Sequence, residues 1–258
     1  MMTPRSSARL TATIGAVIIL ATGCGGTDTR DTPTTSTSSR PSSGVYEPPD
    51  EVRNATVVWS AEPGIDLFST PATLMRAANE SDIIGSYAGL EHAYPGYANA
   101  LDRPYATRYQ VESYRGTIAG TVLNHIQRIQ DTGDGYLVEF CALPNAYGQL
   151  DDGRYRRWYG RGSALAARFT RTDDTLAPTT STPTTTTTPS PAPDRMHWQA
   201  PTYNVFTGWT ISYVVNETSC DDWALSLYPD APVENEISYS DTPPPVQPAY
   251  PGWPTQPD

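Results

Sequence analysis

The sequence contains no lysine, so all 17 of its basic residues are arginines. This absence excludes three kinds of site that need a lysine amine: the Walker A phosphate loop, Schiff-base enzymes and Ser-x-x-Lys hydrolases. The 28 acidic residues bring the formal net charge to −11. Because binding to a phosphate backbone requires a basic surface, we expect no nucleic-acid partner.

Motifs for metal binding and for common hydrolases are also missing. The histidines His92, His125 and His197 are far apart, and no cysteine or carboxylate lies near them at metal-binding spacing. The sequence therefore predicts neither a metal site nor another cofactor. His125 falls in an expected strand, where it is either a general base or simply a hydrogen-bonded residue. A Ser-His-Asp site assembled in space stays open, since such sites follow geometry and not sequence order.

The triplet Asp131-Thr132-Gly133 is the one that aspartic proteases use in pairs, where two aspartates share a proton. A second Asp-Thr-Gly or Asp-Ser-Gly triplet does not occur in this chain. The triplet is followed by Asp134 and Gly135 between two expected strands, which is typical of a turn. We therefore interpret it as the turn of a β-hairpin.

The N-terminus has the three parts of an export signal. Arg5 and Arg9 precede an apolar stretch over residues 10–21, and small residues lead to Cys24. Since a membrane-spanning helix needs about 20 apolar residues, this stretch favours a cleaved signal over a permanent membrane span. The expected signal peptide covers residues 1–23.

The segment Leu20-Ala21-Thr22-Gly23-Cys24 resembles the lipobox of bacterial lipoproteins of the actinobacterial type. Its leucine lies one place further from the cysteine than in the usual pattern. The resemblance implies that Cys24 receives a diacylglyceryl group and anchors the chain to the outer face of the cell membrane, since two acyl chains hold a protein stably. The alternative is a secretory signal cut after Gly23, which leaves Cys24 as a free thiol.

The remaining cysteines, Cys141 and Cys220, form a natural pair in an exported protein, because disulfides persist outside the cytosol. We predict that they are bonded. A loop of roughly 80 residues closed in this way adds about 4 kcal/mol to stability on the chain-entropy view. The alternative is two buried free thiols.

Composition divides the rest of the chain into one domain and three low-complexity segments. Thr, Ser, Pro and Gly dominate a tether over residues 24–50, an insertion at about 172–199 and a Pro-rich tail over residues 233–258. Such segments bury too little apolar surface to order themselves, so we expect them to be disordered or extended. The Thr/Pro insertion resembles the O-mannosylated segments of exported actinobacterial proteins. The single domain then spans residues 51–232 and encloses the insertion.

The hydrophobic pattern predicts helices first and strands afterwards. A strand over residues 56–60 precedes a helix that Thr70 caps with Pro71 at its first position, and a short helical turn covers residues 97–101. Strands are expected over residues 105–114, 117–130, 136–143, 154–171 and 204–215. This order predicts an α+β fold with N-terminal helices packed on a curved antiparallel sheet. It is loosely similar to the nuclear-transport-factor-like cone fold, which implies a pocket between helices and sheet but assigns no residue a role.

One basic patch stands out in this acidic chain, and it interleaves arginines with aromatic residues. Its members are Arg154, Arg156, Arg157, Trp158 and Arg161. Guanidinium groups beside aromatic rings bind phosphate, carboxylate or sugar rings through bidentate hydrogen bonds and stacking. The patch is our leading candidate for binding an anionic envelope lipid or glycan. The alternative is a solvated strand whose arginines balance Asp151 and Asp152.

Three functions remain open after the sequence alone. A non-catalytic binding or accessory protein of the cell envelope is favoured over an enzyme, and it requires a pocket in the sheet. An envelope hydrolase requires His125 or His92 within hydrogen-bond reach of a Ser or Asp in a cleft. A glycosylated structural or adhesive protein requires a folded domain without a pocket.

Overall fold

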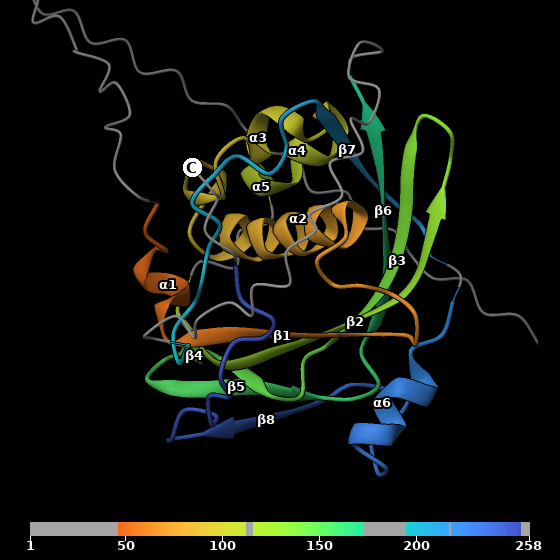
Figure 1. The fold of residues 1–258 in the computed structure, drawn as a ribbon. Coiled ribbons are helices and arrows are strands. Elements are labelled where there is room, and N and C mark those ends of the chain that lie inside the picture. Colours follow the sequence, from red (N-terminus) through yellow and green to blue (C-terminus); the bar gives the residue numbers. More distant parts are fainter. Residues whose placement is uncertain (1–45, 112–115, 173–194, 217, 254–258) are drawn as a thin grey trace, which may run out of the picture. The chain divides into compact units, whose positions relative to one another are not determined.

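The computed structural model describes residues 46–111, 116–172, 195–216 and 218–253 (Figure 1). The export signal, Cys24 and most of the Thr/Pro insertion lie outside these residues. The described part contains helices and one eight-stranded sheet, which confirms the predicted α+β class with a curved sheet.

The N-terminal part forms as the pattern predicts. After the short helix α1 (Asp50–Arg53), strand β1 (Ala55–Ala61) leads to helix α2 (Thr70–Tyr87). Ser69, and not Thr70 as predicted, takes the N-cap position of α2, and a proline lies in its first turn, where the missing N–H costs nothing. The helix is buried on nearly every side, including charged and polar residues. Short helices that follow it are η1 (Leu90–His92) and α3 (Tyr97–Ala100).

The central hairpin joins β2 (Ile118–Asp131) to β3 (Gly135–Leu143). Its turn is the Asp131-Thr132-Gly133 triplet, in which the Gly133 N–H donates to Oδ1 of Asp131 at 2.7 Å. Gly133 has φ +82°, a left-handed conformation that glycine adopts without a Cβ penalty. The interpretation of this triplet as a hairpin turn is therefore confirmed.

The sheet is completed by five more strands: β4 (Tyr147–Asp151), β5 (Arg154–Tyr159), β6 (Ser163–Arg171), β7 (Trp209–Val214) and β8 (Glu236–Ser240). Their order is β7-β6-β3-β2-β4-β5-β8, with β1 paired to β2. Every pairing among the described strands is antiparallel except β1 with β2. The expected strand over residues 154–171 is present as two strands, β5 and β6, that pair with different neighbours.

The sheet bends where β3 passes into β4 and where β5 passes into β6. The early part of β2 pairs with β4, whereas its later part pairs with β3, so one long strand serves both arms of the bend. Gly120 lies at this point of β2 with φ +103°. Figure 1 shows α2 lying along the concave side of the bent sheet, with α3, α4 and α5 on the far side of α2. The bend thus positions α2 opposite several strands at once.

The strand predicted over residues 105–114 is wrong in its described part. Residues 105–111 belong to two short helices, α4 (Arg103–Ala106) and α5 (Arg108–Val111), and residues 112–114 lie outside the described residues. Asp102 caps α4 by accepting the Tyr105 N–H at 3.0 Å, and a proline occupies the first turn. Tyr105 and Tyr109 lie one helical turn apart and both reach the Asp82 carboxylate on α2. These tertiary contacts override the β-propensity of the aromatic residues.

The expected domain limits of 51 and 232 are too narrow. Tyr46 packs edge-on against Tyr94 with ring centroids 5.4 Å apart, and Trp198 is buried although it lies inside the expected insertion. Beyond residue 232, β8 pairs with β5, and Trp253 reaches the core. The proline-rich composition therefore led to a wrong prediction for a segment that tertiary hydrogen bonds hold in place.

The expected strand over residues 204–215 is shorter than predicted and is β7 alone. It is followed by a helix that the pattern missed, α6 (Asp221–Leu227). The predicted disulfide joins Cys141 on β3 to Cys220 at the N-terminal end of α6, with the Cα atoms 5.7 Å apart. It holds α6 against a small second core around Leu123 and Leu143, on the side of the sheet away from α2.

Candidate functional site

A pocket of about 560 Å³ lies between α2 and the concave face of the sheet. This volume is within the range of about 300–1,000 Å³ that small-molecule sites occupy. Its lining comes from α2, α5, the strands β2, β3, β4, β5 and β6, and the connections next to them. The lining residues are Asn79, Asp82, Ile83, Ser86, Tyr87, Arg108, Val122, Asn124, Ala142, Leu143, Pro144, Tyr147, Arg156, Trp158, Ser163, Leu165 and Asn235.

The spacing of these residues follows from their elements. Asn79, Asp82, Ile83 and Ser86 recur every three or four residues, so they share one face of α2. On β2, Val122 and Asn124 are two residues apart and therefore point to the same side of the sheet. The pocket thus has one helical wall and one β wall.

Several buried polar atoms of this lining have no hydrogen-bond partner. Asn124 is 1% exposed, yet neither its Nδ2 nor its Oδ1 is bonded to any described residue. Nδ2 of Asn79 and Nε of Arg156 are also buried and have no hydrogen-bond partner among the described residues. A buried polar atom without a partner costs about 1–3 kcal/mol, and a bound molecule or water would supply the missing bonds. The two walls together therefore offer three donor atoms and one acceptor atom to an occupant.

Arg156 and Trp158 form the charged end of the β wall. The Arg156 guanidinium lies 4.6 Å from the centre of the Trp158 ring, and its Nη2 donates to Oε1 of Gln149 at 3.1 Å. No carboxylate in the described part of the chain forms an ion pair with Arg156. Its charge therefore remains available to an anion.

The predicted patch is divided. Arg157 points to the opposite face of β5 from Arg156, Arg154 lies at the first position of β5, and the strand ends before Arg161. Arg156 and Trp158 line the pocket, whereas Arg154 forms an ion pair with Asp241 at 2.8 Å. Arg157 donates to the carbonyl of Asn145, and Arg161 donates to the carbonyl of Ala231 and lies 3.4 Å from Asp221. Three of the five predicted site residues therefore make structural contacts elsewhere.

Asp82 is the carboxylate of the pocket, and its side chain is 17% exposed. Its Oδ1 accepts hydrogen bonds from Tyr105 at 3.1 Å and Tyr109 at 2.6 Å. Nη1 of Arg108 lies 3.7 Å from the same oxygen. Burial raises the pKa of Asp82 above its ordinary value, while Arg108 and the two hydroxyls oppose part of that rise.

The tyrosines continue this network away from the pocket. Tyr109 shares a hydrogen bond of 2.9 Å with Tyr97, which contacts the Tyr213 hydroxyl at 3.2 Å. Tyr213 in turn donates to the carbonyl of Ala78 on α2 at 3.1 Å. The chain of hydroxyls ties α3, α5 and β7 to α2 and so fixes the helical wall.

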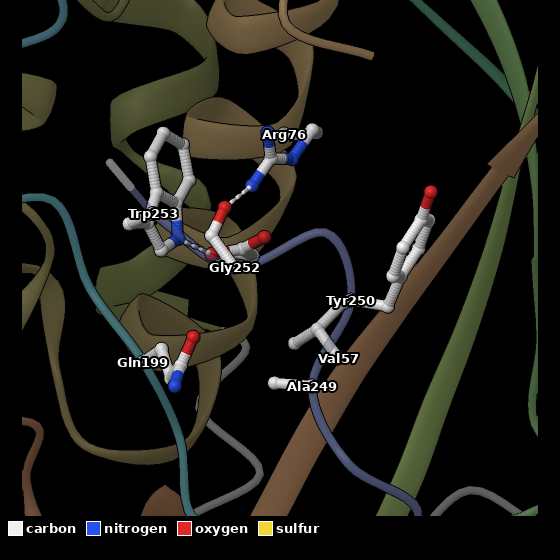
Figure 2. A pocket seen from close by; sticks show the side chains of 8 residues that line it. Val57, Arg76, Gln199, Ala249, Tyr250, Gly252 and Trp253 are labelled. Carbon is white, nitrogen blue, oxygen red and sulfur yellow. Dashed lines mark hydrogen bonds between the residues drawn. The ribbon is translucent and has the colours of Figure 1, made fainter. Parts of the chain in front are cut away.

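A second polar centre lies deeper, around Glu80 on the other side of α2. Its carboxylate accepts hydrogen bonds from the indoles of Trp59 and Trp253 and from the hydroxyl of Tyr94. The cavity beside it measures about 10 Å³, enough for about one water molecule. Figure 2 shows Arg76 pointing to the Gly252 carbonyl beside Trp253. The Glu80 carboxylate thus has its hydrogen-bond donors within the protein and holds the C-terminal segment in place.

The three histidines lie apart from the pocket lining. Nδ1 of His125 is 2.9 Å from Oγ of Ser60, and its Nε2 is 3.2 Å from Oε1 of Glu62. His92 is on the surface, with 53% of its side chain exposed, and His197 lines a separate hollow near Pro243. The described residues contain no group of three or more His, Cys, Asp or Glu that could hold a metal ion.

Sequence reasoning missed most of the lining residues. Asn79 and Asp82 lie on a helix whose apolar face was the only one considered, and Asn124 lies inside a β-rich run. The available signal was the unusual number of polar residues in a helix that the core must surround.

Within the described residues, no helix has the length and apolar character required to cross a membrane. Comparisons with protein-family models, with curated proteins and with solved structures give no match. The geometry of the pocket is therefore the basis for a functional proposal.

Proposed function

We propose that this chain is a lipid-anchored protein of the bacterial cell envelope that binds a small amphipathic anion in the pocket between α2 and the sheet. The observation that carries the proposal is Asn124, which lines this pocket and is almost completely buried with both ends of its amide unpartnered. The notion of a purely structural or adhesive protein, by contrast, gives no reason for such a pocket.

The chemistry of the walls supports the ligand class. Ile83, Val122 and Leu165 provide an apolar surface for the body of a ligand. Two guanidinium groups, those of Arg108 and Arg156, line the pocket together with a single carboxylate, that of Asp82. A carboxylate or phosphate group on the ligand would accept from Nε of Arg156 and from the Asn124 amide. An envelope lipid or glycolipid fragment has this combination of parts.

Support for the anchor comes from the sequence around Cys24 and from the fate of the other cysteines. The lipobox-like segment marks Cys24 for diacylglyceryl transfer, and Cys141 is bonded to Cys220. A disulfide of this kind persists in proteins outside the reducing cytosol. Both features fit one location, the outer face of the cell membrane.

Binding is tested with the fluorescent anion 1-anilinonaphthalene-8-sulfonate and the full chain. Arg156→Gln should raise the Kd of this anion about tenfold or more, because a charge-assisted hydrogen bond contributes about 1.5–3 kcal/mol. The matched control is Arg154→Gln, which changes the same strand outside the pocket and should leave Kd unchanged. Equal affinities for the two variants, with thermal unfolding showing both folded, would refute the pocket as the binding site.

The anchor is tested separately by the intact mass of protein taken from a bacterial membrane fraction. Wild type should carry a diacylglyceryl mass that disappears in Cys24→Ala together with membrane association. An unacylated wild-type product in the soluble fraction would refute the anchor and leave the pocket proposal standing.

A further inference from the structure

Ser60, His125 and Glu62 form a hydrogen-bonded row on the face of the sheet opposite the pocket. Ser60 on β1 and His125 on β2 are register partners in the parallel pair, so their side chains stand next to each other on one face. Glu62 follows β1 directly and stands two residues beyond Ser60 on the same side. Asn124 precedes His125 on β2, so its side chain points to the opposite face, where it lines the pocket.

The distances place His125 between a nucleophile and an acid. Nδ1 lies 2.9 Å from Oγ of Ser60, and Nε2 lies 3.2 Å from Oε1 of Glu62. When Nε2 carries the ring proton it donates to Glu62, which leaves the Nδ1 lone pair directed at the serine hydroxyl. A hydroxyl, a base and an acid that orients the base are the parts of a nucleophilic site.

The surroundings hold the imidazole but leave the row open at one end. Trp223 of α6 stacks on His125 with ring centroids 5.1 Å apart, and the histidine side chain is 9% exposed. Glu62 is 54% exposed and Ser60 is half-buried, so solvent reaches the row from the end of β1. The disulfide partner Cys141 is the register neighbour of His125 and fixes α6 over it.

One contact competes with this arrangement. The Ser60 hydroxyl also lies 3.3 Å from the carbonyl oxygen of Asn124, but a hydroxyl donates only one proton. The contact to Nδ1 of His125 is shorter, at 2.9 Å. Hydrogen bonds between such groups prefer lengths near 2.8 Å, so the proton is directed mainly to the histidine.

From this geometry we infer that Ser60, His125 and Glu62 form a serine esterase site for small carboxylic esters, independent of the ligand pocket. Oγ of Ser60 attacks the ester carbonyl carbon while His125 takes the hydroxyl proton at Nδ1. The C–O bond to the alcohol then breaks, and the alcohol leaves with the proton from His125. Water, deprotonated by His125, hydrolyses the acyl-serine to a carboxylate and restores the serine. Glu62 is a positioning residue, because it acts on His125 and not on the ester.

The first test is labelling of the full chain with a fluorophosphonate probe, followed by peptide mass mapping. We expect the phosphonyl mass on the peptide that contains Ser60, and a rate at least about 100-fold lower in His125→Gln, the contribution typical of a positioned base. Ser238→Ala, which changes an exposed serine of β8 outside both sites, is the matched control and should label like wild type. Ser60→Ala should abolish labelling while thermal unfolding shows the variant folded.

The second test is hydrolysis of p-nitrophenyl acetate followed by nitrophenolate absorbance. Glu62→Gln should lower kcat about tenfold with little change in KM, and Glu62→Asp should restore part of the loss, which a merely structural contact would not do. The inference is overturned if wild-type Ser60 labels no faster than in folded His125→Gln, or if Ser60→Ala hydrolyses the ester as fast as wild type. Neither outcome affects anion binding in the pocket.

Discussion

The indole N–H of Trp253 donates a hydrogen bond of 2.9 Å to Oε2 of Glu80, a residue 173 positions earlier in the chain. This bond joins the end of the described chain to the middle of α2. The Arg76 guanidinium lies 4.4 Å from the centre of the same indole ring and donates to the carbonyl of Gly252. The C-terminal segment is therefore part of the support of the helix that forms one wall of the pocket.

Trp253→Ala should lower the free energy of unfolding by about 3 kcal/mol, because it removes a large packed ring and leaves a buried carboxylate one donor short. Urea denaturation followed by circular dichroism measures this change. Tyr250→Ala is the control, since this side chain is 53% exposed, and it should cost less than about 1 kcal/mol. Equal losses in the two variants would contradict a specific role for the indole.

Trp253 also illustrates what composition could not predict. The patterns of residues 56–60, 117–130 and 136–143, and of the helix near Thr70, predicted their elements because residues recur there with the period of a regular backbone. The proline-rich segment after residue 240 has no such period. Its order comes from hydrogen bonds such as that between the Tyr250 N–H and the carbonyl of Val57, which depend on residues remote in sequence. Local pattern carries no information about such contacts.

The disulfide between Cys141 and Cys220 should contribute about 4 kcal/mol to stability, since it closes a loop with a sequence separation of 79 residues. Removing it in Cys141→Ala/Cys220→Ala should lower the urea midpoint and increase the slope, because the denatured chain without the cross-link is less compact. Both the protein with the disulfide and the variant without it should carry Cys24→Ala, so that they differ only at Cys141 and Cys220. A midpoint unchanged by loss of the disulfide would show that packing of α6 alone holds this face.

Gly120 should be intolerant of a side chain. It has φ +103°, and an added Cβ would lie 2.5 Å from the backbone oxygen of Ala146. Gly120→Ala should therefore destabilise the bend of the sheet by more than about 3 kcal/mol, through both backbone strain and the clash. Gly133→Ala is the matched control, because Gly133 has φ +82° but open space around it, so it should show only the backbone cost of about 1–2 kcal/mol. Thermal unfolding of both variants gives the comparison.

The candidate site was only partly predictable for a related reason. Arg156 and Trp158 were found because arginines beside aromatic rings form a local pattern. Arg154, Arg157 and Arg161 belong to the same pattern, and only the pairing of β5 with β4 and β8 decides which side chains face α2. Asp82 was missed because its partners Tyr105 and Tyr109 were assigned to a strand. Their helical spacing becomes visible only when the cap at Asp102 is recognised.

Asp82 should make stability depend on pH in a defined direction. Its pKa is raised by burial in the folded protein, so the folded state holds the proton more tightly than the unfolded state. Above the ordinary value of 3.8, the folded chain binds more protons than the unfolded chain, and the free energy of unfolding from this group falls as pH rises towards the folded pKa. The stabilisation is fully present below the ordinary value and lost above the folded one.

The variant Asp82→Asn tests this sign, because the amide oxygen can still accept from Tyr105 and Tyr109 while the charge is removed. Urea denaturation at several pH values above 3.8 should show a smaller fall in stability for Asp82→Asn than for wild type. Binding of 1-anilinonaphthalene-8-sulfonate should show the same dependence, since an ionised Asp82 repels an anion held at Arg156, and the variant should bind it with less change across this range. Parallel pH profiles for the two proteins would mean that Asp82 keeps its ordinary pKa, and that its carboxylate is fully stabilised by the two hydroxyls and Arg108.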